Sequence, residues 1–322
     1  MQVLSTQTSY LESKIAELDF PLEPANLYDP LRYFMQLGGK RMRPMLTLMG
    51  AALFGKPAEK ALHAALAVEI FHNFSLIHDD IMDEAPLRRK KQTVHTRWNT
   101  NVAILSGDVL LVKAYQEICK QDAAVLPELL AVFNQTAVEV CEGQQLDMDF
   151  EQQSDVSIPA YVEMIRLKTS VLLGCALEMG AIVAETSLEN RKLIYEFGQH
   201  IGIAFQIQDD ILDLYADPEK FGKQVGGDVL ANKKTLLYLK AKELATPAQL
   251  QQLEDLVANN DPQVKVNGVR NLFDALQIKQ EARKLMDAHY AVALKAFDSI
   301  AVPEASKKDL RELAAYLLVR EI

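Results

Sequence analysis

An acidic motif occupies residues 78–83, which read His-Asp-Asp-Ile-Met-Asp. Asp79 and Asp83 are four residues apart, so on a helix their carboxylates lie one turn apart on the same side and repel each other unless a cation sits between them. Oxygen ligands with open coordination positions suit Mg²⁺, which keeps several waters and also binds the phosphates of a substrate. Taken alone, the motif is equally compatible with a solvated acidic face of a helix.

A second motif, at residues 205–213, repeats this aspartate spacing 130 positions later. Asp209 and Asp213 are again four residues apart in an apolar, helical context, with Asp210 beside the first of them. Aspartate is a poor helix former and is rarely buried without a partner, so two such motifs among aliphatic residues need an explanation. They predict two metal-binding walls that face one cavity.

Two basic clusters accompany the aspartates. Residues 38–44 read Gly-Gly-Lys-Arg-Met-Arg-Pro, and residues 88–91 read Arg-Arg-Lys-Lys. A basic run is usually a solvated surface, but here both runs stand out in a chain with 34 Lys and Arg, 44 Asp and Glu and a net charge of −10. Arginine side chains match phosphate oxygens geometrically, and neighbouring aspartates can supply a metal. The combination predicts a site for a diphosphate with metal ions.

The surrounding sequence predicts long helices that carry these motifs. Gly and Pro number only 14 and 12 in 322 residues, aromatic residues make up 7%, and apolar residues recur at helical spacing almost throughout. We therefore expect an all-α protein with an aliphatic core, folded as one domain over residues 1–322 although length alone would suggest two. The longest stretch without helical periodicity, residues 216–234, borders the second aspartate motif and is the candidate for a closing segment.

Composition also excludes several classes of protein. The negative net charge argues against a nucleic-acid partner or an anionic membrane surface, because both attract basic proteins. The three cysteines, Cys119, Cys141 and Cys175, are far apart and lack metal-binding spacing, which is typical of reduced thiols. The sequence shows neither a signal peptide nor an apolar run long enough for a transmembrane segment. We expect a cytoplasmic protein.

Eight segments together resemble the all-trans polyprenyl diphosphate synthases, which are class I isoprenoid synthases. In family order and spacing, from about Leu31 to Leu237, they are GGKRMRP, HNFSLIHDDIMD, LRRKKQTVH, GQQLD, KTS, FQIQDDILD, GKQVGGD and NKKT. The resemblance implies a single antiparallel helical bundle around a central cavity, usually as a homodimer. It also implies a prenyltransferase that condenses isopentenyl diphosphate with an allylic diphosphate, which can be dimethylallyl, geranyl or farnesyl diphosphate.

The resemblance further implies the roles of individual residues. Three Mg²⁺ ions are expected with substrate bound, held mainly by Asp79, Asp83 and Asp209, with Asp80, Asp210 and Asp213 behind them or bound through water. The residues that match the isopentenyl diphosphate site are Lys40, Arg43, His72 and Arg89. Those that match the allylic diphosphate site are Arg88, Lys168, Thr169, Gln206, Lys223 and Lys233. Lys168, Thr169 and Gln206 are also the expected catalytic residues, Asp147 is expected to support them, and Arg320 is a further candidate cation.

Residues one to two turns before Asp79 are expected to limit product length. Five residues span about 7.5 Å of helix, so the Phe74 ring would form a partial floor below the metal ions, with Ser75 beside it and Phe71 as a second floor. This pattern has one aromatic residue at the fifth position before the first aspartate motif and no insertion within the motif. In the family, it resembles the pattern of synthases that make the C20 product, geranylgeranyl diphosphate. The C15 product, farnesyl diphosphate, is the next candidate.

Three other functions fit parts of the sequence. A non-catalytic subunit of a heteromeric prenyl synthase would keep the fold, but such subunits typically lose aspartates or basic residues that are all present here. Glu69 and His72 form a Glu-x-x-His half-site of the kind found in di-iron carboxylate bundles, although the sequence has no second copy. A terpene cyclase would share the cavity and the first motif, but its second metal motif is of an Asn, Ser and Glu type that residues 209–213 do not match.

Overall fold

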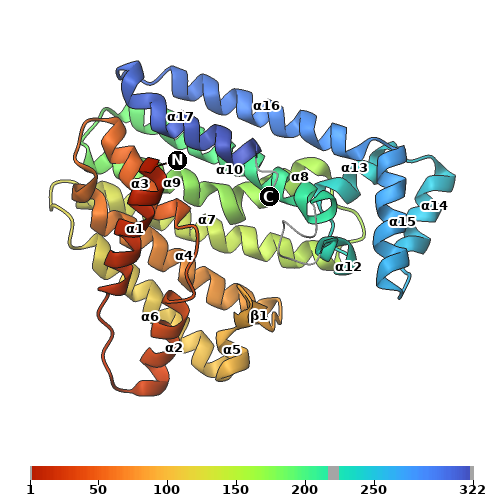
Figure 1. The fold of residues 1–322 in the computed structure, drawn as a ribbon, viewed down its shortest axis with the longest axis horizontal. Helices are drawn as coiled ribbons and strands as arrows, with labels where there is room; N and C mark the ends of the chain where they lie inside the picture. The colour runs from red at the N-terminus through yellow and green to blue at the C-terminus, as the bar shows by residue number, and fades with distance from the viewer. Residues whose placement is uncertain (1, 217–224, 320–322) are drawn as a thin grey trace. The chain divides into compact units, whose positions relative to one another are not determined.

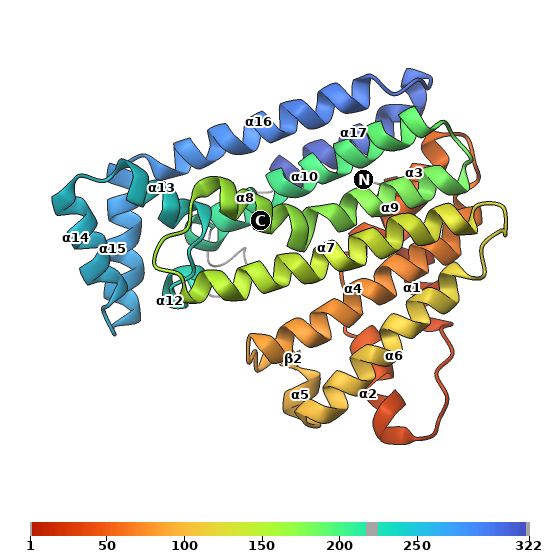
Figure 2. The ribbon, with the colours of Figure 1, turned by 180° about the vertical axis from the view of Figure 1, so that it is seen from behind.

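The computed structural model of the chain describes residues 2–216 and 225–319, and these residues are mostly helical (Figures 1 and 2). The helices of the first half are α1 (Gln2–Ala16), α2 (Ala25–Met35), α3 (Met42–Leu53), the 3₁₀ turn η1 (Ala58–Ala61), α4 (Leu62–Met82), α5 (Val94–Arg97), α6 (Thr100–Ile118) and α7 (Leu126–Gln152). Those of the second half are α8 (Ile158–Ile165), the π-helical turn η2 (Arg166–Ser170), α9 (Val171–Val183), α10 (Leu188–Tyr215), α12 (Gly227–Leu230), α13 (Leu236–Leu244), α14 (Pro247–Val257), α15 (Pro262–Ala275), α16 (Ile278–Asp298) and α17 (Glu304–Val319).

The only strands among the described residues are β1 (Leu87–Arg88) and β2 (Lys91–Gln92), which form one antiparallel hairpin. The all-α class expected from the sequence is therefore confirmed. Lys223 and Arg320 lie outside the described residues, as do residues 217–224 of the expected closing segment.

The chain divides into two compact units, which are described separately. Unit 1 comprises Met1–Gln135, Cys175–Tyr195 and Ala301–Asp309. Unit 2 comprises Thr136–Gly174, Glu196–Ile300 and Leu310–Ile322. The single domain expected from the sequence remains a prediction.

In unit 1, α4 lies along α6 and packs against α3, while α2 covers another part of α6 (Figure 1). Apolar residues of α4 supply its buried side, and Phe71 is 1% exposed. Its ring meets Phe133 edge to face, with the centroids 5.2 Å apart, and Phe133 meets Tyr115 in the same way. Asn99 begins α6 by accepting a hydrogen bond from the backbone N–H of Val102. These contacts fix the helix that carries the first aspartate motif.

Helices α3 and α9 approach each other closely within unit 1, because each helix has a glycine that faces the backbone of the other helix. A Cβ atom on Gly180 would lie 2.1 Å from the carbonyl oxygen of Thr47, and one on Gly50 would lie 2.5 Å from that of Leu177. No side chain fits at either position without moving a helix. The position of α3, which begins just after the first basic cluster, therefore depends on these two glycines.

Unit 2 is built around the C-terminal half of α10. Its core includes Ile207 and Ile211 of α10, Leu236 of α13, Phe273 of α15 and Ile278 of α16, all nearly inaccessible to solvent. Helices α14 and α15 lie side by side in both ribbon views (Figures 1 and 2). The second aspartate motif thus ends a helix that is packed on several sides.

Across residues 2–216 and 225–319, no helix is both long enough and apolar enough to cross a membrane.

Replacing Gly180 by alanine should destabilise the protein, although glycine-to-alanine changes within helices usually stabilise by roughly 0.5–1 kcal/mol. The new Cβ would collide with the backbone of α3, and overpacking of this kind costs about 1–3 kcal/mol. Thermal unfolding of Gly180→Ala measures the effect. Gly268→Ala is the matched control, because its Cβ would meet only the mobile end of Leu256. A melting temperature of Gly180→Ala at or above that of the wild type would contradict the close crossing.

Glu178 of α9 should make the protein less stable as the pH rises. Burial raises the pKa of Glu178 from 4.5 to about 7, so between these values the folded state keeps a proton that the unfolded chain has released. Stability from this group is complete below about pH 4.5 and is lost as the pH rises through about 7. Glu178→Gln should therefore exceed the wild type in stability at pH 8, by at most about 3 kcal/mol, and match it near pH 4.5. Chemical unfolding at both pH values measures the free energy of unfolding of the wild type and of Glu178→Gln, with the exposed-site variant Glu254→Gln as control. A difference between Glu178→Gln and the wild type that is the same at both pH values would disprove the prediction.

Candidate active site

The first aspartate motif lies at the C-terminal end of α4, where its three aspartates have different surroundings. Asp80 is 1% exposed and accepts hydrogen bonds from Arg88, whose Nε lies 2.8 and 2.9 Å from its two carboxylate oxygens. Burial raises the pKa of Asp80, and the charge of Arg88 opposes the shift. Asp79 is half-buried, with Oδ2 3.5 Å from an Nη of Arg88, and Asp83 is the exposed residue that ends the helix. Asp79 and Asp83 are therefore more accessible than Asp80, and their role as metal ligands stays a prediction.

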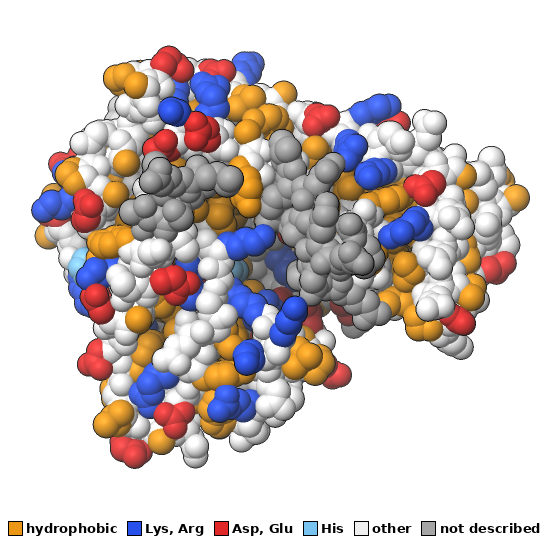
Figure 3. Space-filling view, in the orientation of Figure 1, with side chains coloured by type: hydrophobic (Ala, Val, Ile, Leu, Met, Phe, Trp, Pro, Cys, Tyr) orange, Lys and Arg blue, Asp and Glu red, His pale blue; other side chains and the backbone are white. Residues whose placement is uncertain are grey.

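Arg88 and Arg89 are positioned by the β1–β2 hairpin. Its two-residue turn consists of Arg89 and Lys90, both with positive φ, which is the backbone of a type I′ turn. The Arg89 guanidinium lies over Gly39, where a Cβ atom would come within 2.9 Å of both its Nη atoms. Glycine at position 39 thus makes room for Arg89 beside the first basic cluster. On the face shown in Figure 3, Lys and Arg side chains gather over this hairpin.

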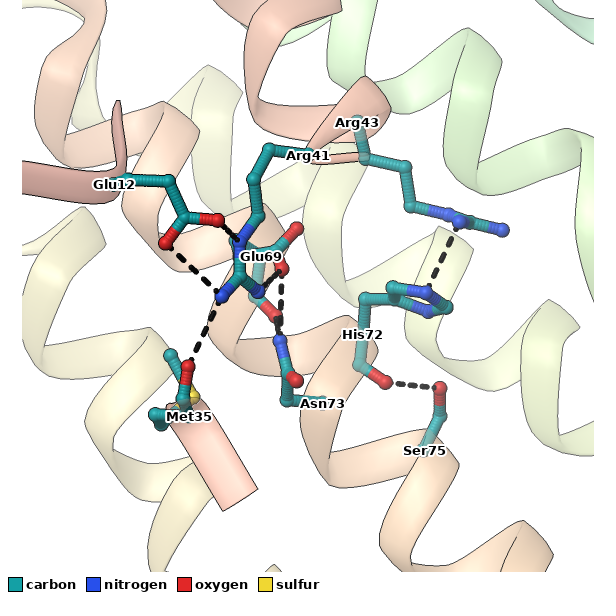
Figure 4. Close-up of polar contacts among 8 residues, drawn as sticks. All are labelled: Glu12, Met35, Arg41, Arg43, Glu69, His72, Asn73 and Ser75. Carbon is teal, nitrogen blue, oxygen red and sulfur yellow. Dashed lines mark hydrogen bonds and ion pairs between the residues drawn. The ribbon is translucent and has the colours of Figure 1, made fainter. Parts of the chain in front are cut away.

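The expected isopentenyl diphosphate residues come together in unit 1. Arg43 Nη1 lies 3.1 Å from His72 Nε2, as Figure 4 shows. Because a guanidinium only donates hydrogen bonds, His72 Nε2 accepts this one, and the imidazole proton is on Nδ1. Burial, together with the charges of Arg43 and Arg89, holds the pKa of His72 well below its usual 6.5. Lys40 lies exposed in the turn before α3.

A buried network that sequence reasoning missed lies beside this group. Arg41 is 3% exposed and donates hydrogen bonds to Glu69, to Glu12 of α1 and to the carbonyl oxygen of Met35 (Figure 4). Asn73 donates to Glu69 as well, at 3.0 Å. The only sequence signal was Glu69 three residues before His72, which suggested a di-iron half-site. In the structure Glu69 pairs with Arg41 and His72 with Arg43, so the two do not act as one half-site.

In unit 2, Lys168 and Thr169 lie in the π-helical turn η2, an irregularity common at functional sites. Two glycines let neighbouring helices approach this turn. A Cβ atom on Gly143 of α7 would lie 2.2 Å from the backbone nitrogen of Lys168, and one on Gly202 of α10 would lie 2.7 Å from Cα of Ser170. The residues one turn beyond the glycines then reach the turn: Lys168 Nζ lies 2.5 Å from Asp147, and Thr169 Oγ1 lies 3.5 Å from Gln206.

The second aspartate motif, at the end of α10, repeats the pattern of the first. Its second aspartate, Asp210, is 3% exposed and accepts a short hydrogen bond from the buried hydroxyl of Tyr161. Burial and the charge of Asp228 raise the pKa of Asp210 to about 8. Asp209 and Asp213 are half-buried, and Asp213 accepts a hydrogen bond from the backbone N–H of Asp228 at 3.0 Å. Sequence reasoning missed Tyr161, which had no spacing signal.

A pocket of about 200 Å³ opens beside this motif within unit 2. Asp210, Asp213 and Lys233 line its polar side, and Leu237 and Phe273 are among the residues of its apolar side. Lys234, the residue after Lys233, also lines the pocket and donates to the carbonyl oxygens of Phe150 and Glu151 at 2.6 and 3.1 Å. Both adjacent lysines therefore lie at the pocket, and the ammonium of Lys234 is bonded to the backbone of α7.

The residues expected to limit product length lie on α4. The Phe74 ring packs between Phe71 and His78, with centroid distances of 5.6 and 4.7 Å. His78 Nε2 lies 3.1 Å from the carbonyl oxygen of Ile104 on α6. Ser75 donates to the carbonyl oxygen of His72. The role of these residues in chain length stays a prediction, as does the facing of the two aspartate motifs across one cavity.

Comparisons with known proteins identify relatives over nearly the whole chain. The model of the family described as polyprenyl synthetase matches residues 24–276. A geranylgeranyl pyrophosphate synthase of Geoglobus acetivorans is 36% identical over 323 residues, covering 99% of each chain. A geranylfarnesyl diphosphate synthase of Natronomonas pharaonis is also 36% identical, over 84% of this chain and 86% of its own. A crystal structure of a geranylgeranyl pyrophosphate synthase superposes with a TM-score of 0.92 at 45% identity, covering 99% of this chain and 98% of that one.

These similarities extend beyond the motif-bearing segments into the C-terminal helices, where the sequence itself carried no assignable motif. The solved relative shares the helical fold, which confirms the isoprenoid synthase architecture expected from the motifs. The chain belongs to the polyprenyl synthetase family and is a prenyltransferase.

Proposed function

We propose that the protein is a Mg²⁺-dependent synthase that condenses isopentenyl diphosphate with an allylic diphosphate and makes geranylgeranyl diphosphate as its main product. The observation that carries this proposal is that unit 1 brings Asp79 beside Arg88, and Arg89 near Arg43. Carboxylates for a metal and arginines for a diphosphate on adjoining elements match the chemistry of a metal diphosphate.

The donor atoms fit Mg²⁺, and three ions are proposed with substrate bound. Within the described part of the chain, no three His, Cys, Asp or Glu side chains gather closely enough to hold a metal ion by themselves. Few protein ligands suit Mg²⁺, which keeps waters and shares its remaining positions with phosphate oxygens. Asp79, Asp83 and Asp209 would be the main ligands, with Asp80, Asp210 and Asp213 behind them or bound through water. Asp80 and Asp210 are buried and accept hydrogen bonds from Arg88 and Tyr161. When bound, Mg²⁺ supplies electrostatic stabilisation of the departing diphosphate.

The residues of unit 1 would bind and orient isopentenyl diphosphate. Lys40, Arg43 and Arg89 supply positive charge, and neutral His72 offers its Nδ1–H as a donor. Fixing the diphosphate in this way places the double bond of the substrate where it can attack the allylic carbon. A charged His72 would be repelled by the neighbouring arginines, which is why its neutral form suits the site.

The residues of unit 2 would bind the allylic diphosphate. Lys168, Thr169, Gln206 and Lys233 would hold its oxygens. When the allylic carbon–oxygen bond breaks, the electron pair leaves with the diphosphate, and these cations stabilise the developing charge. The new carbon–carbon bond then forms, and the proton lost afterwards passes to the released diphosphate. Exclusion of water keeps the allylic cation from being hydrolysed.

The proposal of the C20 product rests on Phe74. Two of the relatives are each 36% identical to this chain, yet their names give different products, geranylgeranyl and geranylfarnesyl diphosphate. Overall similarity therefore does not decide the product. One half-buried aromatic ring at the fifth position before Asp79, next to the small Ser75, supports a floor at intermediate depth.

The protein is further proposed to be a cytoplasmic homodimer. Helix α6 of unit 1 supports the dimer, because Ile104, Leu105 and Val112 are 42–56% exposed along it. An apolar row of this kind on a helix is typical of a surface that another subunit covers.

Loss of either leading aspartate should nearly abolish turnover. Asp79→Ala removes a proposed metal ligand from the first motif, and Asp209→Ala removes one from the second. For each variant we expect the rate of pyrophosphate release to fall by about 10²–10³-fold or more. The assay contains isopentenyl diphosphate, an allylic diphosphate and Mg²⁺, and chelation of the metal should have the same effect. Asp287→Ala, at an exposed position of α16, is the control. Normal rates in both aspartate variants would refute the metal site.

Truncation of the Phe74 ring should lengthen the main product. Phe74→Ala removes the proposed floor, so the growing chain can extend by one or more five-carbon units before it is released. Mass spectrometry of the products measures chain length directly. Phe54→Ala, which removes another half-buried ring of unit 1, controls for loss of packing. A product distribution identical to that of the wild type would show that Phe74 is not the floor.

A further inference from the structure

Arg41 stands between two residues of the proposed isopentenyl diphosphate site, Lys40 and Arg43, yet its side chain takes another direction. Its backbone is left-handed, with φ 47° and ψ 35°, at the residue before α3. Figure 4 shows Arg41 extending to Glu69 and Glu12, whereas Arg43 extends over His72. Only 1% of the Arg41 side chain is exposed. One of three cations in this short run is therefore committed to the interior.

The Arg41 guanidinium joins four helices of unit 1. Nη1 donates to Glu69 of α4 at 2.5 Å, and Nε donates to Glu12 of α1 at 2.8 Å. Nη2 donates to the carbonyl oxygen of Met35, the last residue of α2, at 3.0 Å. Arg41 itself precedes α3. Lysine could not replace these bonds, because its single ammonium lacks the planar fork of donors.

The network reaches the substrate-binding residues through α4. Glu69 lies one turn before His72, and the Arg41–Glu69 pair ties the start of α3 to that turn. The same two elements carry Arg43 and His72, whose side chains meet at 3.1 Å. Glu69 also attracts Arg43, whereas Arg89 repels it. Without the Arg41–Glu69 pair, the distance between the start of α3 and this turn of α4 would no longer be fixed. If Glu69 were the residue lost, a negative charge that attracts Arg43 would be removed as well.

We propose that Arg41 is a positioning residue: its ion pair with Glu69, completed by Glu12, holds Arg43 and His72 at the spacing that binds isopentenyl diphosphate. This inference rests on the proposed function. Because the Arg41 side chain is buried and paired, it would act without touching the substrate. A purely structural role would lower stability and affect both substrates alike, whereas a positioning role affects isopentenyl diphosphate alone.

Steady-state kinetics of Arg41→Lys, with each substrate varied in turn, test the proposal. We expect the KM for isopentenyl diphosphate to rise about tenfold or more, because small misplacements of binding groups have effects of this size. The KM for the allylic diphosphate should change by less than about twofold. Glu69→Gln should act in the same direction. Arg191→Lys is the control, because Arg191 is paired with Glu128 in the same unit and belongs to neither proposed substrate site.

A second readout does not depend on turnover. ¹⁵N NMR of the imidazoles should show the Nδ1–H form of His72 in the wild type and a mixture of both tautomers in Arg41→Lys. If Arg41→Lys does not fold, Glu12→Gln, which removes the charge of the more exposed partner, should raise the same KM to a smaller extent. Unchanged KM values, or values that rise equally for both substrates, would overturn the role of Arg41. A wild-type protein that releases no pyrophosphate would instead refute the proposed function.

Discussion

Like charges repel strongly in an apolar interior, and each unit of this protein still holds cations that are buried or half-buried. The structure meets this constraint by giving several of these cations a carboxylate neighbour. Arg88 is held by Asp80, and Lys168 by Asp147. Arg43 has the charge of Glu69 nearby, while its direct partner, His72, stays neutral. The cations are thus fixed in place without being fully neutralised.

The same constraint explains why the two aspartates at the start of each motif differ. Two adjacent carboxylates that both faced a metal would repel each other whenever the metal was absent. In each motif the second aspartate is buried and engaged, Asp80 by an arginine and Asp210 by a tyrosine hydroxyl. The first and last aspartates of each motif are more exposed than the second. Removing one partner of a buried ion pair generally costs about 3–5 kcal/mol because the other charge is left unpaired, so loss of Arg88 would leave the buried Asp80 carboxylate without this ion pair.

Backbone proximity decides where these side chains lie. Gly39 makes room for Arg89, and Gly143 and Gly202 let two helices reach the π-helical turn of Lys168. Motif glycines such as Gly39 and Gly143 were visible in the sequence, but the atoms that would clash with a Cβ there belong to residues far along the chain. Tyr161 and Glu12 gave no sequence signal for the same reason, because each bonds to a residue that only packing brings near.

The sequence by itself determined the all-α class, the two aspartate motifs and the basic clusters that accompany them. Helical periodicity and four-residue spacing are local properties, so they can be read along one segment. Only the tertiary structure decided which member of each Asp-Asp pair is buried, that Arg41 turns inward while Arg43 meets His72, and that Glu69 belongs to an ion pair and not to a di-iron half-site. Those choices depend on the direction of each side chain and on its burial against other helices. Spacing along the chain carries neither quantity.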